Sequence, residues 1–99
     1  MWFFRGNEKM SNNATETLIA VRQKTHGDFR DVGRVSQKLK EIMKTSPNWN
    51  KLPPHQQEGL EMNAHKVARI LCGDPNFKEH WDDIAGYATR VAGYLSCAD

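Results

Sequence analysis

The sequence predicts an all-α fold, a small bundle of about four helices, and three observations support this prediction. Apolar residues recur at helical spacings of three and four, no segment alternates as a strand does, and Gly and Pro clusters divide the chain. A length of 99 residues suits one small domain with a modest core, which a dimer interface would help to stabilise. No apolar run approaches the roughly 20 residues that span a bilayer, so we expect a cytoplasmic protein without a membrane partner.

Residues 1–13 are expected to form a flexible leader ahead of a single domain that covers residues 14–99. The leader opens with MWFF, which is too short for the apolar region of a signal peptide. The first helix is predicted to run from Asn13, whose side chain can cap it, to about Lys24. Its predicted inner face consists of Ala14, Leu18 and Val21.

The segment THGDF separates the first helix from the second. Gly27 permits a break, and Asp28 can cap a second helix that runs from about Phe29 to Lys44. One apolar stripe follows helical spacing along it, formed by Val32, Val35, Leu39, Ile42 and Met43. Five basic residues lie largely outside that stripe, namely Arg30, Arg34, Lys38, Lys40 and Lys44.

A proline-rich loop, SPNWNKLPP, follows the second helix, and Trp49 and Leu52 are expected to pin it to the core. The third helix is predicted from Pro54, which suits a first turn, to about Cys72, with Gly73 ending it. Its predicted stripe is Leu60, Ala64, Val67, Ala68 and Leu71. A fourth helix over residues 78–96 is predicted to turn inward Trp81, Ile84, Ala85, Ala88, Val91, Ala92 and Leu95.

Charge is distributed unevenly along the chain. Residues 1–53 hold ten Lys or Arg and five Asp or Glu, a net charge of +5, whereas residues 54–99 hold four and seven, a net charge of −3. The two halves are expected to attract each other within one fold or across a dimer. A nucleic-acid partner is not expected, because Asp31 and Glu41 interrupt the basic second helix and no aromatic residues interleave with it.

Five acidic residues of the third and fourth helices form a candidate metal site: Glu58, Glu61, Glu79, Asp82 and Asp83. Carboxylates that face one point repel each other unless a cation lies between them, and Mg²⁺ prefers oxygen ligands that it shares with substrate phosphates. Such an ion would activate water for attack on a phosphoanhydride. Lys66 and Arg69 are the candidates for binding the phosphates.

An alternative explanation needs no metal ion, because acidic residues in the first turns of a helix complement its dipole. Antiparallel packing of the third and fourth helices would also bring Glu79 closer to Arg69 than to Glu58. A single site therefore requires a tilted crossing, an intervening helix or a second subunit.

Three segments of the chain carry a resemblance: RQKTHGDF, HKVARILCGDPN and HWDDIAGYA. Together they resemble an uncharacterised family of small helical proteins encoded by bacteriophages and prophages, over roughly residues 15–96. The resemblance implies a phage origin and a bacterial host cytoplasm, and it implies no activity.

A second resemblance rests on the acidic pattern. Glu58-x-x-Glu61, seventeen residues, then Glu79-x-x-Asp82 resembles the ExxE…ExxD signature of the MazG-like nucleoside triphosphate pyrophosphohydrolases, which are all-α and usually oligomeric. The resemblance implies Mg²⁺ binding by these carboxylates and release of pyrophosphate. The final Asp of that signature is typically followed by an aliphatic residue, which fits Asp83 better than Asp82 and places His80 where an acid belongs.

Three further residues have both a functional and a structural interpretation. His26 is a candidate ligand or base that Asp28 would orient, or a turn residue beside a capping Asp. His65 is a site residue or an interhelical hydrogen-bond partner, and Trp81 stacks on a base or belongs to the core. We expect the structural interpretation for each.

The function expected first is a phage-type MazG-like enzyme, a Mg²⁺-dependent nucleoside triphosphate pyrophosphohydrolase or a nucleotide-binding relative, acting as a homo-oligomer. Glu61 and Asp83 are its catalytic candidates. The alternative is a non-enzymatic phage protein that binds and modulates a bacterial host protein through the basic second helix or the aromatic leader.

Overall fold

The computed structural model describes residues 9–96, with side chains over residues 13–95. Within this range the chain forms four α-helices, no strand and one short 3₁₀ turn: α1 (Lys9–His26), α2 (Phe29–Lys44), η1 (Trp49–Lys51), α3 (Pro54–Cys72) and α4 (Lys78–Ser96). The predicted all-α fold with four helices is therefore confirmed. Trp2, Phe3, Phe4 and Cys97, which the sequence also singles out, lie outside the described residues.

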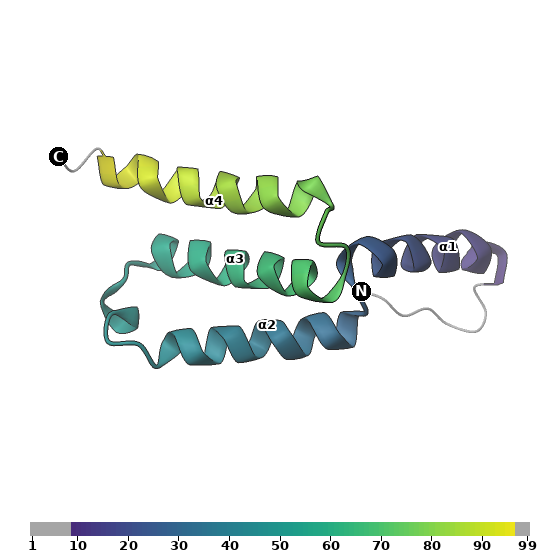
Figure 1. Cartoon of the computed structure of the whole chain (residues 1–99), viewed down its shortest axis with the longest axis horizontal. Helices are drawn as coiled ribbons and strands as arrows, with labels where there is room; N and C mark the ends of the chain where they lie inside the picture. The colour runs from purple at the N-terminus through teal and green to yellow at the C-terminus, as the bar shows by residue number, and fades with distance from the viewer. Residues whose placement is uncertain (1–8, 97–99) are drawn as a thin grey trace.

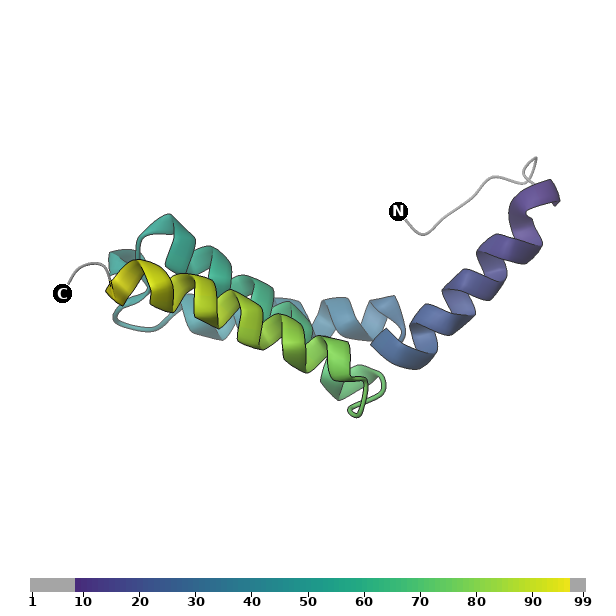
Figure 2. The same cartoon turned by 90° about the horizontal axis from the view of Figure 1, so that it is seen from above.

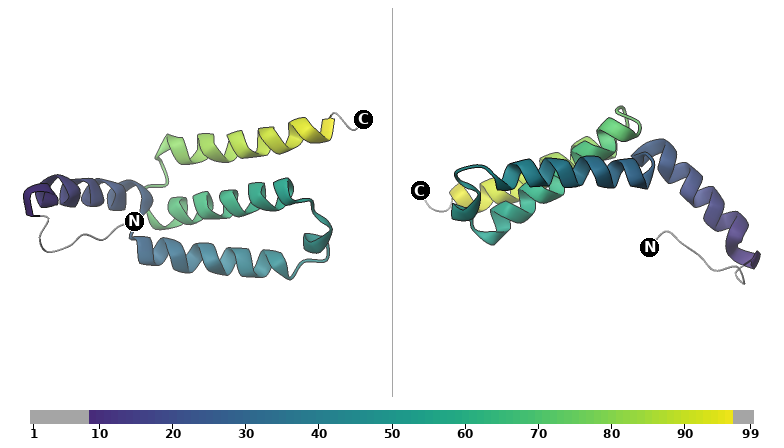
Figure 3. Two further views of the ribbon diagram at one scale, coloured as in Figure 1. Left: turned by 180° about the vertical axis from the view of Figure 1, so that it is seen from behind. Right: turned by 90° about the horizontal axis from the view of Figure 1, so that it is seen from below.

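Helices α2, α3 and α4 form a single layer, with α3 in the middle (Figures 1 and 3). The principal contacts of the layer are those of α3 with α4 and of α3 with α2. Short connections join neighbours, so each helix runs antiparallel to the next. Because one layer leaves both of its faces uncovered, this arrangement buries less than a closed bundle would.

Helix α1 projects from the end of the layer where α2 begins and α3 ends (Figure 2). It starts at Lys9, inside the segment predicted to be a leader, and ends at His26, two residues beyond the predicted end. Gly27 turns the chain with a φ of 90°, a backbone conformation that favours glycine. The predicted inner face of α1 is wrong for a single chain, because Leu18 is 48% exposed and Val21 is 54% exposed.

Helix α2 has the predicted ends. The Asp28 carboxylate accepts a hydrogen bond from the backbone N–H of Arg30 at 3.4 Å and caps the helix. Val32 is buried, Val35, Leu39 and Met43 are half-buried, and Ile42 is exposed. The predicted stripe is therefore at least half-buried at every position except Ile42.

The loop between α2 and α3 is held by Trp49, which is 8% exposed. Gln57 of α3 donates a side-chain hydrogen bond to the Trp49 carbonyl oxygen at 2.9 Å. Leu52 is half-buried beside it. The prediction that Trp49 and Leu52 pin the loop is confirmed.

Small residues bring α3 close to its neighbours. Ala64 and Ala68 are buried, and a Cβ added at Gly59 would lie 2.9 Å from Cγ2 of Val91 on α4. The sequence also predicted that Ala85, Ala88 and Ala92 of α4 face inward. Ala85, Gly86, Ala88, Ala92 and Gly93 are all exposed in the single chain.

The inward face of α4 is also rotated relative to the prediction. Trp81, expected in the core, is 54% exposed, and its indole N–H donates to the Pro75 carbonyl oxygen at 2.9 Å. The preceding residue, His80, is only 1% exposed. A histidine side chain therefore occupies the position that hydrophobicity assigns to tryptophan.

The apolar core of the described chain is small. Four apolar residues are buried, namely Val32, Trp49, Ala64 and Ala68. Nine large apolar side chains are exposed: Leu18, Val21, Phe29, Ile42, Leu60, Leu71, Trp81, Tyr94 and Leu95. The radius of gyration of 16.8 Å exceeds the value of about 13 Å for a compact chain of this length. An elongated chain with this surface is suited to association.

Candidate functional site

The three segments that carry the phage resemblance meet at one end of the helical layer. The backbone N–H of Asp74 donates to the Thr25 carbonyl oxygen at 3.0 Å, and Nε2 of His80 donates to the same oxygen at 3.1 Å. We call this contact the junction, and it consists of Thr25, His26, Gly27, Cys72, Gly73, Asp74 and His80. The junction fixes the end of α1 against the turn between α3 and α4.

Two glycines allow the backbones to meet at the junction. A Cβ added at Gly73 would lie 2.5 Å from the Thr25 carbonyl oxygen. A Cβ added at Gly27 would lie 2.7 Å from the carbonyl carbon of Cys72. Both separations are shorter than real Cβ contacts, so glycine is required at each position.

Aromatic rings fill the space next to this backbone contact. The ring centroids of His26 and His80 are 4.7 Å apart, and Phe77 lies 4.9 Å from His80. Nδ1 of His26 forms a hydrogen bond with the Thr25 hydroxyl at 2.8 Å. His26, predicted to be a turn residue, is instead the last residue of α1 and packs against α4.

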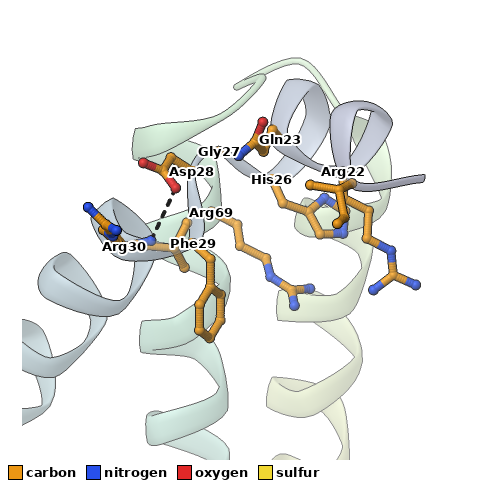
Figure 4. A pocket seen from close by; sticks show the side chains of 10 residues that line it. Arg22, Gln23, His26, Gly27, Asp28, Phe29, Arg30 and Arg69 are labelled. Carbon is orange, nitrogen blue, oxygen red and sulfur yellow. Dashed lines mark hydrogen bonds between the residues drawn. The ribbon is translucent and has the colours of Figure 1, made fainter. Parts of the chain in front are cut away.

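A pocket of about 260 Å³ opens beside the junction, between α1, the start of α2 and α3 (Figure 4). It is lined by Ile19, Arg22, Gln23, His26, Gly27, Asp28, Phe29, Arg30, Val32 and Arg69. Three of these are arginines, each from a different helix, and Asp28 is the one carboxylate among them. We call this cavity the arginine pocket.

Positive groups surround His26 on the wall of the arginine pocket. Burial, followed by the charges of Arg69, His80, Arg22 and Lys66, lowers the pKa of His26 from 6.5 to about 4. The imidazole is therefore neutral at pH 7, with one nitrogen as donor and one as acceptor, and Nδ1 is the nitrogen that bonds the Thr25 hydroxyl.

Arg69 is partly buried and has charged neighbours of both signs. Burial and then the charge of Arg22 lower its pKa, whereas the carboxylates of Asp83 and Glu79 act in the opposite direction. Glu79 therefore lies near Arg69, as antiparallel packing of the two helices predicts. An anion in the pocket would relieve the repulsion between Arg69 and Arg22.

The predicted metal ligands are spread over the layer and pair with lysines. Three ion pairs involve them: Glu61 with Lys44 at 3.6 Å, Asp82 with Lys78 at 2.6 Å, and Asp83 with Lys66 at 3.0 Å. Glu58 and Glu79 are exposed. In residues 9–96 of one chain, no group of three or more His, Cys, Asp or Glu side chains lies close enough to hold a metal ion.

The two predicted phosphate-binding residues have different surroundings. Arg69 lines the arginine pocket. The Lys66 side chain is only 12% exposed, and its Nζ contacts Asp83, whose pKa is lowered first by this hydrogen bond. The metal-binding and catalytic roles of Glu61 and Asp83 stay predictions.

The sequence did not predict that Arg22, Arg30 and His26 line one pocket. One signal was present, because Arg22 and His26 are four residues apart and share a face of α1. The approach of Arg69 from α3 depends on the junction, which residue spacing does not reveal.

Comparison of the chain with protein-family models, curated proteins and solved structures found no match. Among the described helices, none has both the length and the apolar character needed to traverse a lipid bilayer. The fold and the pocket together define a small all-α protein with a cationic cavity at the junction of three helices.

Acid is expected to destabilise the fold between pH 7 and pH 5. Burial, followed by the charges of Arg69, Lys40, Lys66 and His80, also lowers the pKa of His65 to about 4. Between pH 6.5 and pH 4 the unfolded chain binds more protons at His26 and His65 than the folded chain, so the free energy of unfolding falls as pH falls. Because both rings are partly exposed, we expect a loss on the order of 1–2 kcal/mol.

Urea unfolding followed by circular dichroism at pH 7 and pH 5 measures this loss. The double variant His26→Gln and His65→Gln should show a smaller difference between the two pH values. An equal midpoint at both pH values for the unsubstituted chain would contradict the prediction.

Proposed function

We propose that this protein binds a phosphate-bearing small molecule, with a nucleotide as the first candidate, in the arginine pocket. One observation carries the proposal: Arg22, Arg30 and Arg69, from three different helices, all line one cavity that also includes a neutral His26, and Arg30 is directed away from the other two (Figure 4). Guanidinium groups present paired donors that match the oxygens of a phosphate.

Two neighbouring features favour a nucleotide over a simple anion. The pocket includes the first residues of α2, where the helix dipole favours negative charge and the Asp28 carboxylate already accepts the Arg30 N–H. The aromatic ring of Phe29 lines the cavity and is exposed (Figure 4), so its face is available for stacking on a base. A cavity of about 260 Å³ suits a ligand that is partly enclosed.

Hydrolysis is the narrower form of this proposal, and it rests on the MazG-like resemblance. The two carboxylates that act on Arg69, Glu79 and Asp83, are those that would share a Mg²⁺ ion with phosphates held by that arginine. Asp83 would have to exchange its contact with Lys66 for the ion. Glu58 and Glu61 would reach such an ion only from a second copy of the chain or after a rearrangement.

Replacing Arg69 with glutamine is expected to weaken nucleotide binding by roughly 10- to 100-fold, because a charge-assisted hydrogen bond contributes about 1.5–3 kcal/mol. Isothermal titration calorimetry with nucleoside triphosphates, with and without Mg²⁺, measures the affinity. Arg34→Gln is the matched control, since Arg34 lies outside the pocket and pairs with Asp31 at 3.9 Å. Equal losses in both variants would indicate a nonspecific charge effect and overturn the pocket assignment.

Pyrophosphate release separates the binding protein from the enzyme. Activity that requires Mg²⁺ and is abolished by Glu61→Gln and by Asp83→Asn would support the pyrophosphohydrolase. Nucleotide binding without turnover would support a non-hydrolytic relative. Failure of every nucleotide to bind would overturn both the nucleotide-binding proposal and its hydrolytic form.

The alternative, a protein that binds a bacterial host factor, is favoured by the outer face of α2. That face exposes Arg30, Arg34 and Lys38 together with Ile42, a mixture of basic and apolar groups. The charge reversals Arg34→Glu and Lys38→Glu should release a host protein that co-purifies in stoichiometric amount. Unchanged co-purification would exclude this face.

A further inference from the structure

Helix α1 presents two faces, and only one of them contacts its own chain. Ile19, Arg22, Gln23 and His26 share the face that lines the arginine pocket. The adjacent face carries Leu18 and Val21, both about half exposed, with Ala14 one turn before Leu18. Figure 2 shows that α1 points away from the helical layer, so no other part of the described chain covers this second face.

A second, largely apolar cavity lies between α3 and α4, toward the end of the layer that is far from α1. It has a volume of about 320 Å³, and Gly59, Leu60, Asn63, Ala88 and Leu95 are among its lining residues. Leu60 and Leu95 are exposed. Oδ1 of Asn63 is buried and lacks a hydrogen-bond partner, a deficit that a donor on an occupant would remove after rotation of the amide. We call this cavity the α3–α4 groove.

We infer that the α3–α4 groove receives α1 of a second copy of this chain, and that two copies exchange their α1 helices reciprocally. The chain's own α1 cannot reach the groove, because the junction directs α1 away from the layer. A two-fold axis near the junction would place each α1 along the other copy's layer.

The dimensions of the two surfaces agree with this exchange. Leu18 lies eight residues before the end of α1, roughly 12 Å along the helix axis. The residues of α3 and α4 that line the groove lie nine to seventeen residues from the junction ends of their helices, roughly 14–26 Å away, and Ala14 lies twelve residues, roughly 18 Å, from the end of α1. A helix of 18 residues covers on the order of 500 Å² on each side of a contact, so two exchanged helices bury roughly 2,000 Å², enough for a stable dimer.

Charge also favours a second copy as the occupant. The sequence of α1 contains Lys9, Arg22 and Lys24 against Glu16, a net charge of +2. Residues 54–96 contain four Lys or Arg and six Asp or Glu, a net charge of −2. The two segments therefore attract each other, and the attraction weakens as salt is added, whereas no residue that lines the groove is charged.

Light scattering after size-exclusion chromatography tests the exchange on the full chain. Each chain has a mass of 11.3 kDa, so we expect the mass of two chains for the unsubstituted protein. Leu18→Asp and Leu60→Asp should each give the mass of one chain, because each places a carboxylate in the apolar contact. Leu71→Asp is the control and should remain dimeric, since Leu71 is exposed on α3 but does not line the groove.

A charge pair identifies which surfaces meet. The double variant Ala14→Asp with Leu60→Lys should keep the mass of two chains, because both positions lie twelve residues from the junction ends of their helices and the new carboxylate and ammonium groups would face each other in both contacts. Circular dichroism should show that each single variant keeps its helical content, since both side chains are exposed in one chain.

Three results would overturn the inference. The first is the mass of one chain for the unsubstituted protein at every concentration. The second is a dimer that Leu18→Asp dissociates and Leu60→Asp does not, which would mean that α1 pairs with another surface. A complex with one bacterial protein bound to a single chain through Leu18 would equally exclude a second copy as the occupant.

Discussion

Replacing Gly27 with alanine is expected to lower the free energy of unfolding by roughly 3–5 kcal/mol, since two unfavourable effects combine at this position. The φ of Gly27 is 90°, which side-chain-bearing residues rarely adopt. The added Cβ would lie 2.7 Å from backbone and side-chain atoms of Cys72. Rigid backbone cannot move aside as a flexible side chain would, so the junction must open. Thermal unfolding should show a melting temperature lower by more than about 10 °C.

Gly33→Ala and Gly86→Ala are the matched controls for this prediction. Both glycines lie inside helices, and a Cβ added at either position meets no other atom within 4 Å. Alanine is favoured over glycine in a helix by about 0.5–1 kcal/mol, so both controls should raise the melting temperature. Equal melting temperatures for Gly27→Ala and the unsubstituted chain would show that the junction does not hold the fold.

Opening the junction is also expected to affect the arginine pocket. Arg22 and His26 reach the pocket from α1, whereas Arg69 reaches it from α3. The contact of Gly27 with Cys72 sets the distance between these helices. If the proposed ligand binds there, Gly27→Ala should weaken binding under conditions in which the variant remains folded.

Helix ends were the most predictable part of the fold. Asp28, Pro54 and Gly73 each have a local chemical reason to begin or end a helix, and α2 and α3 have the predicted limits. The start of α1 was wrong, because the prediction took Asn13 as the cap, whereas α1 begins at Lys9 and Asn13 lies inside it.

The buried faces were less predictable than the helix ends. The helical spacing of apolar residues predicted that Trp81 lies in the core. His80 is buried instead, because its Nε2 donates a hydrogen bond to the Thr25 carbonyl oxygen. The Thr25 carbonyl oxygen needs this donor only because α1 packs against the turn before α4. Leu18 and Val21 follow a predicted apolar stripe that a single chain leaves exposed.

The candidate site was predictable in part. Arg69 was named for phosphate binding and does line a cationic pocket. Arg22 and Arg30 come from other helices, and they join Arg69 only because Gly27 redirects the chain between them. Acidic spacing also suggested one metal site, but ion pairs with Lys44, Lys66 and Lys78 occupy three of its carboxylates in the single chain.

Replacing Trp49 with alanine is expected to lower the free energy of unfolding by about 3–5 kcal/mol. Trp49 is the largest of the four buried apolar residues, so its removal leaves a cavity in an already small core. The loop backbone would keep its hydrogen bond from Gln57, because that bond is accepted by the main-chain carbonyl oxygen. The decrease in the free energy of unfolding would therefore measure the packing of the Trp49 side chain. Urea unfolding at one fixed protein concentration measures it.

Trp81→Ala is the matched control, because the chain then loses the same side chain from an exposed position. Its indole donates one hydrogen bond to the Pro75 carbonyl oxygen, and the loss of that bond and its partial burial should amount to about 1 kcal/mol. The total stability of a chain of this length is roughly 5–15 kcal/mol, so Trp49→Ala removes a large share of it and Trp81→Ala does not. A larger loss for Trp81→Ala would mean that α4 buries this face against a second chain, and that the core of the assembled protein differs from the core of one copy.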